Sequence, residues 1–211
     1  MPTLEQARAW YAAADPVHDF QHVQRVLALA ERLGRELGAD LELLRAAVLL
    51  HDAEGAAPAD AAGRAAHHEN SAAFAATVLA AEGWPAERIA AVQHCIRAHR
   101  FRGAEAPRTL EAQILFDSDK LDVLGAIGAA RAMAYAALAG QPLTGAPSER
   151  FRATGQTEPG EPHTPYHEYL FKLSKIKDRL HTPAARALAA ERHRYLDEYF
   201  QRLAREEAGE A

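Results

Sequence analysis

The chain has 211 residues, of which 48% are hydrophobic and 25% charged, a composition that suits one globular domain of ordinary size. Its single cysteine excludes an internal disulfide, and its net charge of -5 argues against a general affinity for nucleic-acid polymers. No apolar run approaches the roughly 20 residues that span a bilayer, and the N-terminus lacks the pattern of a signal peptide. We therefore expect a cytoplasmic protein that has no membrane partner.

Apolar residues recur at three- and four-residue steps through most of the chain, which predicts amphipathic helices. Within 18–37 the residues with this spacing are His22, Val26, Leu29, Leu33 and Leu37. Gly38 is expected to end this helix and Asp40 to cap the next one. Further helices are expected over residues 41–52, 64–81, 85–100, 109–121, 124–139, 166–180 and 183–207. Alternating β-branched runs are absent, so the sequence predicts an all-α bundle of about eight or nine helices.

One long irregular stretch, residues 140–165, is rich in Gly, Pro, Thr and Ser. A loop of this length in a compact domain usually has a function or is disordered. We expect a single domain over 1–211, with a motif-bearing core at about 18–140 and a C-terminal helical pair at about 166–207. The sequence does not determine the oligomeric state.

Two histidines and two aspartates follow, or lie within, apolar helical segments. They are His22, the adjacent pair His51 and Asp52, and Asp119, with Asp117 close by. A carboxylate without a partner is costly on an apolar face, and a divalent cation would remove that cost. Two imidazoles and two carboxylates suit Mn, Fe, Co, Ni or Zn better than Ca or Mg. The pattern therefore predicts a transition-metal site with room for water or substrate.

The order His22, then His51-Asp52, then Asp119 resembles the H…HD…D signature of the HD-domain superfamily. The flanking segments HDFQHVQRV, LLHD, IRAHRF and DSDKLDVLGAIGAAR resemble its YedJ/YpgQ-like branch, as does KLSKIKDRLHTPAARALAAERHRYL near the C-terminus. The resemblance covers nearly the whole chain. It implies an HD-domain helical bundle, a single divalent metal that is often Mn, and phosphohydrolase activity on nucleotides.

The resemblance also implies a reaction in which a nucleoside triphosphate, ribo or deoxy, is cut to a monophosphate and pyrophosphate. Metal-bound water would supply the hydroxide, and positioning and charge stabilisation would supply much of the catalysis. The alternatives are a 5′-nucleotidase or other phosphoesterase, a non-catalytic nucleotide-binding regulator, and a di-iron HD oxygenase.

Three carboxylates are candidates for the catalytic steps. Asp52 belongs to the HD pair itself, and Glu54 follows it as a candidate general base. Family alignment places the fourth metal ligand at Asp119, directly before Lys120, which leaves Asp117 as a supporting residue or base. Related enzymes that cleave guanosine tetraphosphate carry an ED pair slightly later, where this chain has EGAAPAD. That departure argues against guanosine tetraphosphate as the substrate.

Four further side chains are candidates for binding substrate, with solvent-exposed roles as the alternative. His18 precedes His22 by one helical turn and Arg25 follows it by one turn, where a guanidinium could meet a phosphate. Lys172 and Lys175 match lysines of the family's C-terminal segment and share one helical face.

The remaining histidines raise the possibility of a second metal. They are His67, His68, His94 and His99. Some HD proteins bind additional ions through histidines on intervening helices, and His68 and His99 stand at suitable places. The branch that this chain resembles does not require a histidine near position 68. We therefore expect one metal, and we assign His99 to the substrate side.

Overall fold

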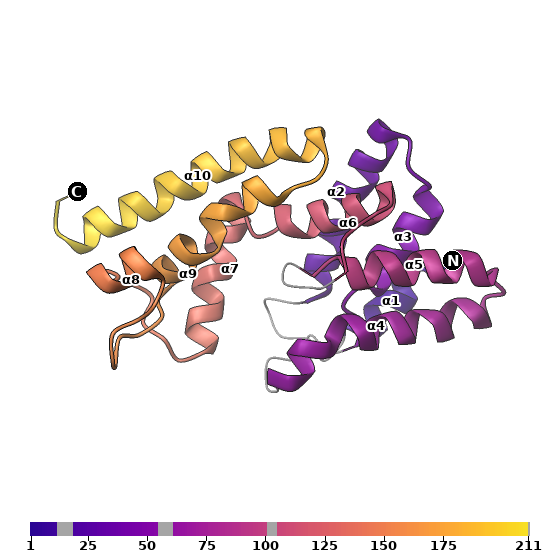
Figure 1. Ribbon diagram of the computed structural model, residues 1–211, viewed down its shortest axis with the longest axis horizontal. Helices are drawn as coiled ribbons and strands as arrows, with labels where there is room; N and C mark the ends of the chain where they lie inside the picture. Colours follow the sequence, from indigo (N-terminus) through magenta and orange to yellow (C-terminus); the bar gives the residue numbers. More distant parts are fainter. Residues whose placement is uncertain (12–18, 55–60, 101–104, 211) are drawn as a thin grey trace. The chain divides into compact units, whose positions relative to one another are not determined.

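The structure is a computed structural model that describes residues 1–11, 19–54, 61–100 and 105–210, with the side chains of 61–66 left out (Figure 1). Over these residues the chain forms ten α-helices, one 3-10 helix and no strand, which confirms the all-α prediction. It divides into two compact units, Met1–Asp119 and Lys120–Ala211. The expectation of one functional domain over the whole length stays a prediction.

The first unit is arranged around a central helix. Its helices are α1 (Leu4–Trp10), α2 (Phe20–Leu37), α3 (Leu41–Leu50), α4 (Ala61–Ala81), α5 (Ala86–Ala98) and α6 (Leu110–Leu121), which ends just past the unit boundary. Helix α3 contacts α1, α2, α4 and α5. Its side chains are apolar on nearly every face and mostly buried, as expected for a core helix. The residue that follows α3 therefore lies in the interior of the first unit.

The ends of α2 and α3 follow from their capping residues. The Asp19 carboxylate accepts a hydrogen bond from the His22 backbone N–H and starts α2. Gly38 has a φ of 76° and ends α2, and Asp40 caps α3 through the Leu43 N–H, as predicted. Helix α3 stops at Leu50, two residues earlier than expected, so the HD pair lies in the turn that follows it.

The second unit contains α7 (Gly125–Leu138), α8 (Glu149–Thr154), α9 (Pro165–Phe171), the 3-10 helix η1 (Leu173–Arg179) and α10 (Pro183–Glu207). Helix α10 packs on α7 and η1. The rings of Tyr169 and Phe200 stack 4.7 Å apart between centroids and join α9 to α10. A Cβ on Gly128 would lie 2.2 Å from the Val123 carbonyl oxygen. That glycine therefore permits the close approach of Val123 to the first turn of α7.

Three differences from the predicted helices have local causes. Helices α1 and α8 were not expected, and each has fewer than eight residues, too few to show periodicity. Both depend on side-chain caps, a Thr3–Gln6 capping box for α1 and Ser148 for α8. Helix α8 lies inside the stretch expected to be irregular. The segment expected as one helix over 166–180 breaks at Lys172, where the backbone leaves helical geometry.

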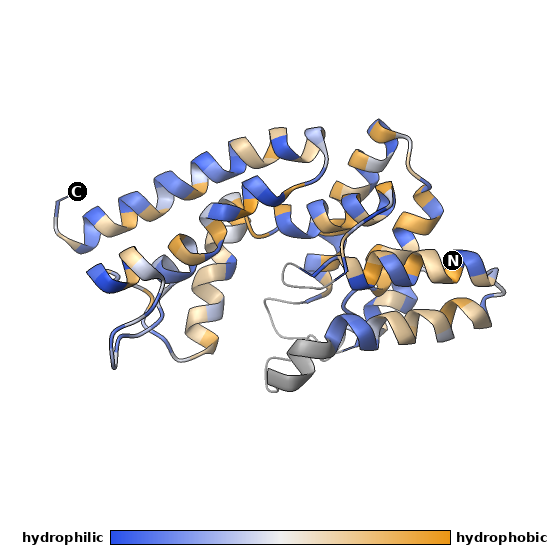
Figure 2. Ribbon diagram, in the orientation of Figure 1, coloured by the Kyte–Doolittle hydropathy of each residue, from blue (hydrophilic) through white to orange (hydrophobic). Residues whose placement is uncertain are grey.

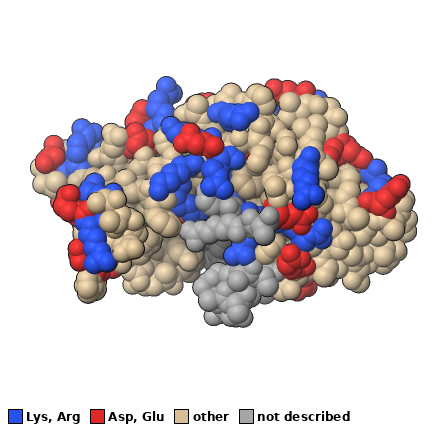
Figure 3. Space-filling view, viewed as in Figure 1, with Lys and Arg blue, Asp and Glu red and all other residues tan. Residues whose placement is uncertain are grey.

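Polar and apolar residues alternate along most helices, and α10 is largely hydrophilic (Figure 2). In the described part of the chain no single helix has the length and apolar character needed to cross a membrane. Only α6 and α7, taken together as a bent pair, pass that test on length and composition. Basic and acidic side chains are mixed on the face shown in Figure 3.

Candidate metal centre

The HD pair lies in the turn at the C-terminal end of α3, where the last carbonyl groups of a helix have no intrahelical partner. The Nδ1 atom of His51 is 2.7 Å from the Val48 carbonyl oxygen. Because a carbonyl only accepts, Nδ1 must carry the proton, and Nε2 then presents a lone pair. His51 is fully buried, and its Nε2 has no hydrogen-bond partner among the described residues. A metal ion is the partner that suits such a nitrogen.

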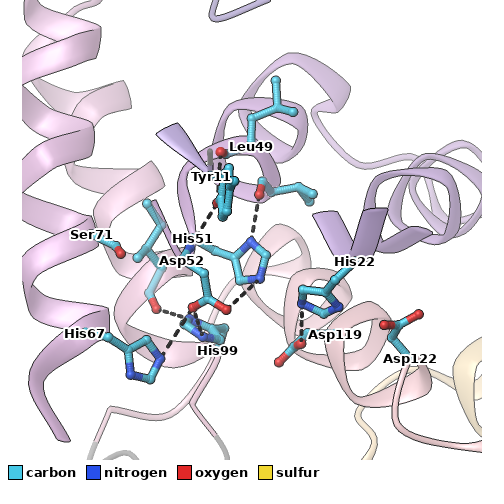
Figure 4. Close-up of polar contacts among 12 residues, drawn as sticks. Tyr11, His22, Leu49, His51, Asp52, His67, Ser71, His99, Asp119 and Asp122 are labelled. Carbon is cyan, nitrogen blue, oxygen red and sulfur yellow. Dashed lines mark hydrogen bonds and ion pairs between the residues drawn. The ribbon is translucent and has the colours of Figure 1, made fainter. Parts of the chain in front are cut away.

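Asp52 extends its carboxylate between several imidazoles (Figure 4). Its Oδ2 atom is 3.5 Å from His51 Nε2, and its Oδ1 atom is 3.4 Å from both His67 Nε2 and His99 Nε2. Two ligand atoms that each lie about 2.1 Å from a shared ion are about 3.0 Å apart when adjacent and about 4.2 Å apart when opposite. The observed separations fall between these limits. The spacing around Asp52 therefore suits coordination better than direct hydrogen bonding.

His22 and Asp119 complete the predicted set from two other helices. His22 lies on α2 and Asp119 on α6, and His22 Nε2 is 3.4 Å from Asp119 Oδ1. Both are buried, at 1% and 9% exposure. Ligand atoms of His22, His51 and Asp52 all lie within 4.8 Å of one another, and Asp119 adjoins them through His22. The structure thus brings together the four side chains predicted from the motif, and their role as ligands stays a prediction.

A second cluster shares Asp52 and includes His67 and His99, again with ligand atoms within 4.8 Å of one another. His99 follows α5 as His51 follows α3, and its Nδ1 is 2.5 Å from the Ile96 carbonyl oxygen. Its Nε2 is therefore also the nitrogen with a lone pair, and it points at Asp52 (Figure 4). The structure places His99 beside the carboxylate of the HD pair.

From the sequence, His67 is among the histidines that could bind a second metal, but His68 rather than His67 is expected at the suitable position. The two are adjacent on α4, and one residue turns a helix by about 100°, so they point in different directions. His67 faces Asp52, whereas His68 Nε2 lies 3.8 Å from Glu69. The available signal was a pair of histidines on one helix, but the pair alone does not say which one faces inward.

The protonation of the cluster follows from its burial. Burial lowers the pKa of His51 to about 4, so the ring is neutral at pH 7 and keeps its lone pair. Burial acts to raise the pKa of Asp52, but the imidazoles of His51 and His99 hold that pKa well below its ordinary value. Neutral imidazoles beside a carboxylate form a donor set suited to a borderline divalent cation.

The candidates for proton transfer lie at different depths. Asp117 is fully buried on α6, and two residues of helix turn it about 200° away from Asp119. Glu54 is exposed in the turn after α3 and belongs to neither cluster. Its backbone N–H donates to Ser71 Oγ at 3.1 Å. The structure thus fixes the main chain of Glu54 near the centre while its side chain faces solvent.

The candidates for substrate binding are spread over both units. Arg25 is half-buried on α2, one turn after His22, and His18 lies outside the described residues. In the second unit, Lys172 Nζ forms an ion pair with Glu168 at 2.9 Å, and Lys175 Nζ lies 5.6 Å from the centre of the Phe171 ring. These contacts give each lysine a local role, and phosphate binding by them stays a prediction.

Comparison with known proteins places this centre in a family context. Residues 19–124 match the family model of the HD domain. YpgQ of Bacillus subtilis (strain 168), an uncharacterized protein, is 29% identical over 213 residues, covering 97% of this chain and 94% of YpgQ. The crystal structure of YpgQ in complex with ADP is similar with a TM-score of 0.73 and 27% identity, over 97% of both chains.

Two further crystal structures cover almost the same length. A Lactobacillus plantarum protein has a TM-score of 0.75 and 29% identity, over 98% of this chain and 95% of its own. An HD-superfamily hydrolase from Bacillus thuringiensis has a TM-score of 0.68 and 25% identity, over 96% and 93%. The similarity therefore includes both units and extends beyond the motif.

Proposed function

Because the chain belongs to the HD domain family, we propose that it is a metal-dependent phosphohydrolase that cleaves nucleoside triphosphates, ribo or deoxy, to monophosphates and pyrophosphate. The observation that carries the proposal is the buried cluster of His22, His51 and Asp52. Similarity to an HD-superfamily hydrolase supports the reaction class. The ADP complex of YpgQ supports a nucleotide as the substrate.

A divalent ion would be held by His22, His51, Asp52 and Asp119, and this mixed nitrogen and oxygen set favours Mn over Mg. Iron, cobalt, nickel and zinc suit the same donors. When bound, the ion would lower the pKa of a coordinated water and polarise a phosphoryl oxygen. The buried Nε2 of His51, with no hydrogen-bond partner among the described residues, is the structural feature that fits this ion.

The chain's own residues would orient the reactants around that ion. The Val48 carbonyl fixes the His51 ring so that Nε2 faces the cluster. Asp117 and Glu54 are the carboxylates proposed to receive a proton from the attacking water. Arg25, one turn from His22, is proposed to meet a phosphate through its two-pronged guanidinium, with Lys172 and Lys175 proposed for the pyrophosphate charge.

The second cluster of Asp52, His67 and His99 supports a weaker second metal site, as an alternative to the proposed contact of His99 with substrate. It offers three protein ligands where the first site offers four, and the His67 side chain is 19% exposed. We expect Mn to bind in two phases, and His99→Ala to remove only the weaker phase. The same cluster favours metal-dependent oxygenation as a second candidate function, which oxygen uptake with iron loaded would identify.

Product analysis across nucleoside mono-, di- and triphosphates in the presence of Mn tests the substrate. We expect triphosphates to give monophosphate and pyrophosphate. Release of inorganic phosphate from monophosphates alone would replace this proposal with a 5′-nucleotidase. Nucleotide binding without turnover would indicate a regulator.

The role of Arg25 has a matched control on the same helix. Arg25→Ala should lower triphosphate turnover about tenfold and leave Mn affinity nearly unchanged, since it removes a charged hydrogen bond to phosphate. Arg32 is an exposed arginine of α2, and Arg32→Ala should leave both quantities unchanged. Equal turnover in the two variants would remove Arg25 from the site.

A further inference from the structure

The turn that carries the HD pair is held by a side chain from far earlier in the sequence. The Tyr11 hydroxyl donates to the Leu49 carbonyl oxygen at 3.2 Å and accepts from the Asp52 backbone N–H at 3.3 Å. One hydroxyl therefore contacts the main chain on both sides of the Leu50–His51 step (Figure 4). A helix end and the turn after it leave such groups without helical partners, so Tyr11 satisfies two of them.

Tyr11 is itself rigidly placed. It follows α1 directly and is 5% exposed. Its ring contacts Phe20 at the start of α2, with 6.0 Å between ring centroids. The neighbouring Trp10 packs edge-on against Phe74 of α4 at 5.4 Å. The phenol ring is thus held against α2, and the residue before it is held against α4.

A second hydroxyl holds the other end of the same turn. Ser71 of α4 is fully buried, and its Oγ accepts from the Glu54 N–H at 3.1 Å and lies 3.3 Å from the Glu54 carbonyl oxygen, to which it donates. The turn of residues 51–54 is therefore anchored by one hydroxyl at Asp52 and by another at Glu54. Neither hydroxyl is needed to satisfy the imidazoles or the carboxylate of the cluster.

From these contacts we propose that Tyr11 and Ser71 are positioning residues, whose hydroxyls set the direction of the Asp52 carboxylate and so determine metal affinity. The proposal rests on the function proposed above. The Asp52 side chain has only two rotatable bonds, so a small rotation of its backbone displaces both oxygens.

The test is the Mn affinity of Tyr11→Phe, which removes the hydroxyl and keeps the ring that packs on Phe20. Loss of a group that orients a metal ligand typically costs 10–100-fold in affinity, and we expect about tenfold here. The absorption spectrum of the Co-substituted protein should also change, because the ligand geometry changes. Ser71→Ala should act in the same direction with a smaller loss.

Tyr169→Phe is the matched control. Tyr169 is also 5% exposed, and its hydroxyl donates to Asp197 in the second unit. The Tyr169→Phe variant should be less stable than the wild type, as Tyr11→Phe should be, but it should keep the wild-type Mn affinity and the wild-type spectrum of the Co-substituted protein. That difference separates positioning from a general loss of packing.

Wild-type affinity and spectrum in both Tyr11→Phe and Ser71→Ala would overturn the proposal. If Tyr11→Phe does not fold, Ser71→Ala decides alone, since it alters the same turn by a smaller change. Failure of the unmodified protein to bind Mn, Co or Zn would instead contradict the proposed function, so the two failures are distinguishable.

Discussion

Each unit contains a buried histidine beside a carboxylate, but the ring nitrogens of the two histidines differ in their hydrogen-bond partners. In the second unit, His167 is 1% exposed, and its Nε2 lies 2.9 Å from Glu161 Oε1. Its Nδ1 lies 2.8 Å from Thr164 Oγ1. In the first unit, His51 uses only Nδ1, on the Val48 carbonyl, and its Nε2 has no hydrogen-bond partner in the described part of the chain.

The difference separates a structural histidine from a candidate ligand. Glu161 accepts from the Ser148 backbone N–H and Oγ in addition to His167, so that cluster is complete as it stands. In the cluster around Asp52, the buried Nε2 of His51 has no hydrogen-bond partner among the residues that the structure describes, which is costly unless a cation completes the cluster. Residue types alone do not distinguish the two cases. The number of ring nitrogens that have a hydrogen-bond partner distinguishes His167 from His51.

The largest expected effect is that of Asp52→Ala. We expect Mn affinity to fall by more than about 100-fold, since losing a ligand costs more than losing a group that orients one. Hydrolysis should be lost with it, while the far-ultraviolet circular dichroism stays helical. Calorimetric titration and a turnover assay measure the two losses. Wild-type turnover in this variant would exclude Asp52 from the centre.

His167→Ala is the counterpart in the second unit. It removes the contacts of the ring with the Thr164 backbone N–H, with Thr164 Oγ1 and with Glu161, so the free energy of unfolding should fall by about 2 kcal/mol. Mn affinity should stay at the wild-type value. A large loss of Mn affinity in His167→Ala would contradict this distinction, because a histidine whose two ring nitrogens both have protein partners would then contribute to metal binding.

A smaller contrast is expected between Asp119→Asn and Asp117→Asn. Asp119 lies 3.4 Å from His22 Nε2, and Asp117 points about 200° away on the same helix. Asp119→Asn should therefore lower Mn affinity by about tenfold, and Asp117→Asn by less. Titrating Mn into both variants, with circular dichroism as a check on folding, decides between them. The reverse order would move the fourth ligand to Asp117.

The smallest expected effect is a pH dependence of the second unit. The hydrogen bond from His167, together with those from Ser148, lowers the pKa of Glu161 to about 2 from an ordinary value of 4.5. The folded state then binds fewer protons than the unfolded state, so this stabilisation is full above about pH 4.5 and is lost as the pH falls toward 2.

Glu161→Gln isolates that contribution. It should be less stable than the wild type to urea at pH 6, and the gap should narrow at pH 3. Unfolding curves of both proteins at the two pH values measure it. If the difference in stability between the wild type and Glu161→Gln is the same at both pH values, the charge of the Glu161 carboxylate does not contribute to the stability of the second unit.

Periodicity and capping chemistry carry enough information to predict the longer helices. The recurrence of Val26, Leu33 and their neighbours predicts α2, and Gly38 and Asp40 mark the next boundary. Helices α1 and α8 escape this reasoning because they are too short for a periodic face. The break at Lys172 also escapes it, since the apolar spacing continues across the break.

By itself, the sequence determined which residue types are available for a metal and the order in which His22, His51-Asp52 and Asp119 occur, because a motif is a property of the linear chain. The tertiary structure determines which of the side-chain atoms are in contact. It turned His67 rather than His68 toward Asp52, placed His99 on the same carboxylate, and brought Tyr11 to the turn from 41 residues away. These are contacts between separate helices, whose rotation and approach are set by packing of the whole unit rather than by any local pattern.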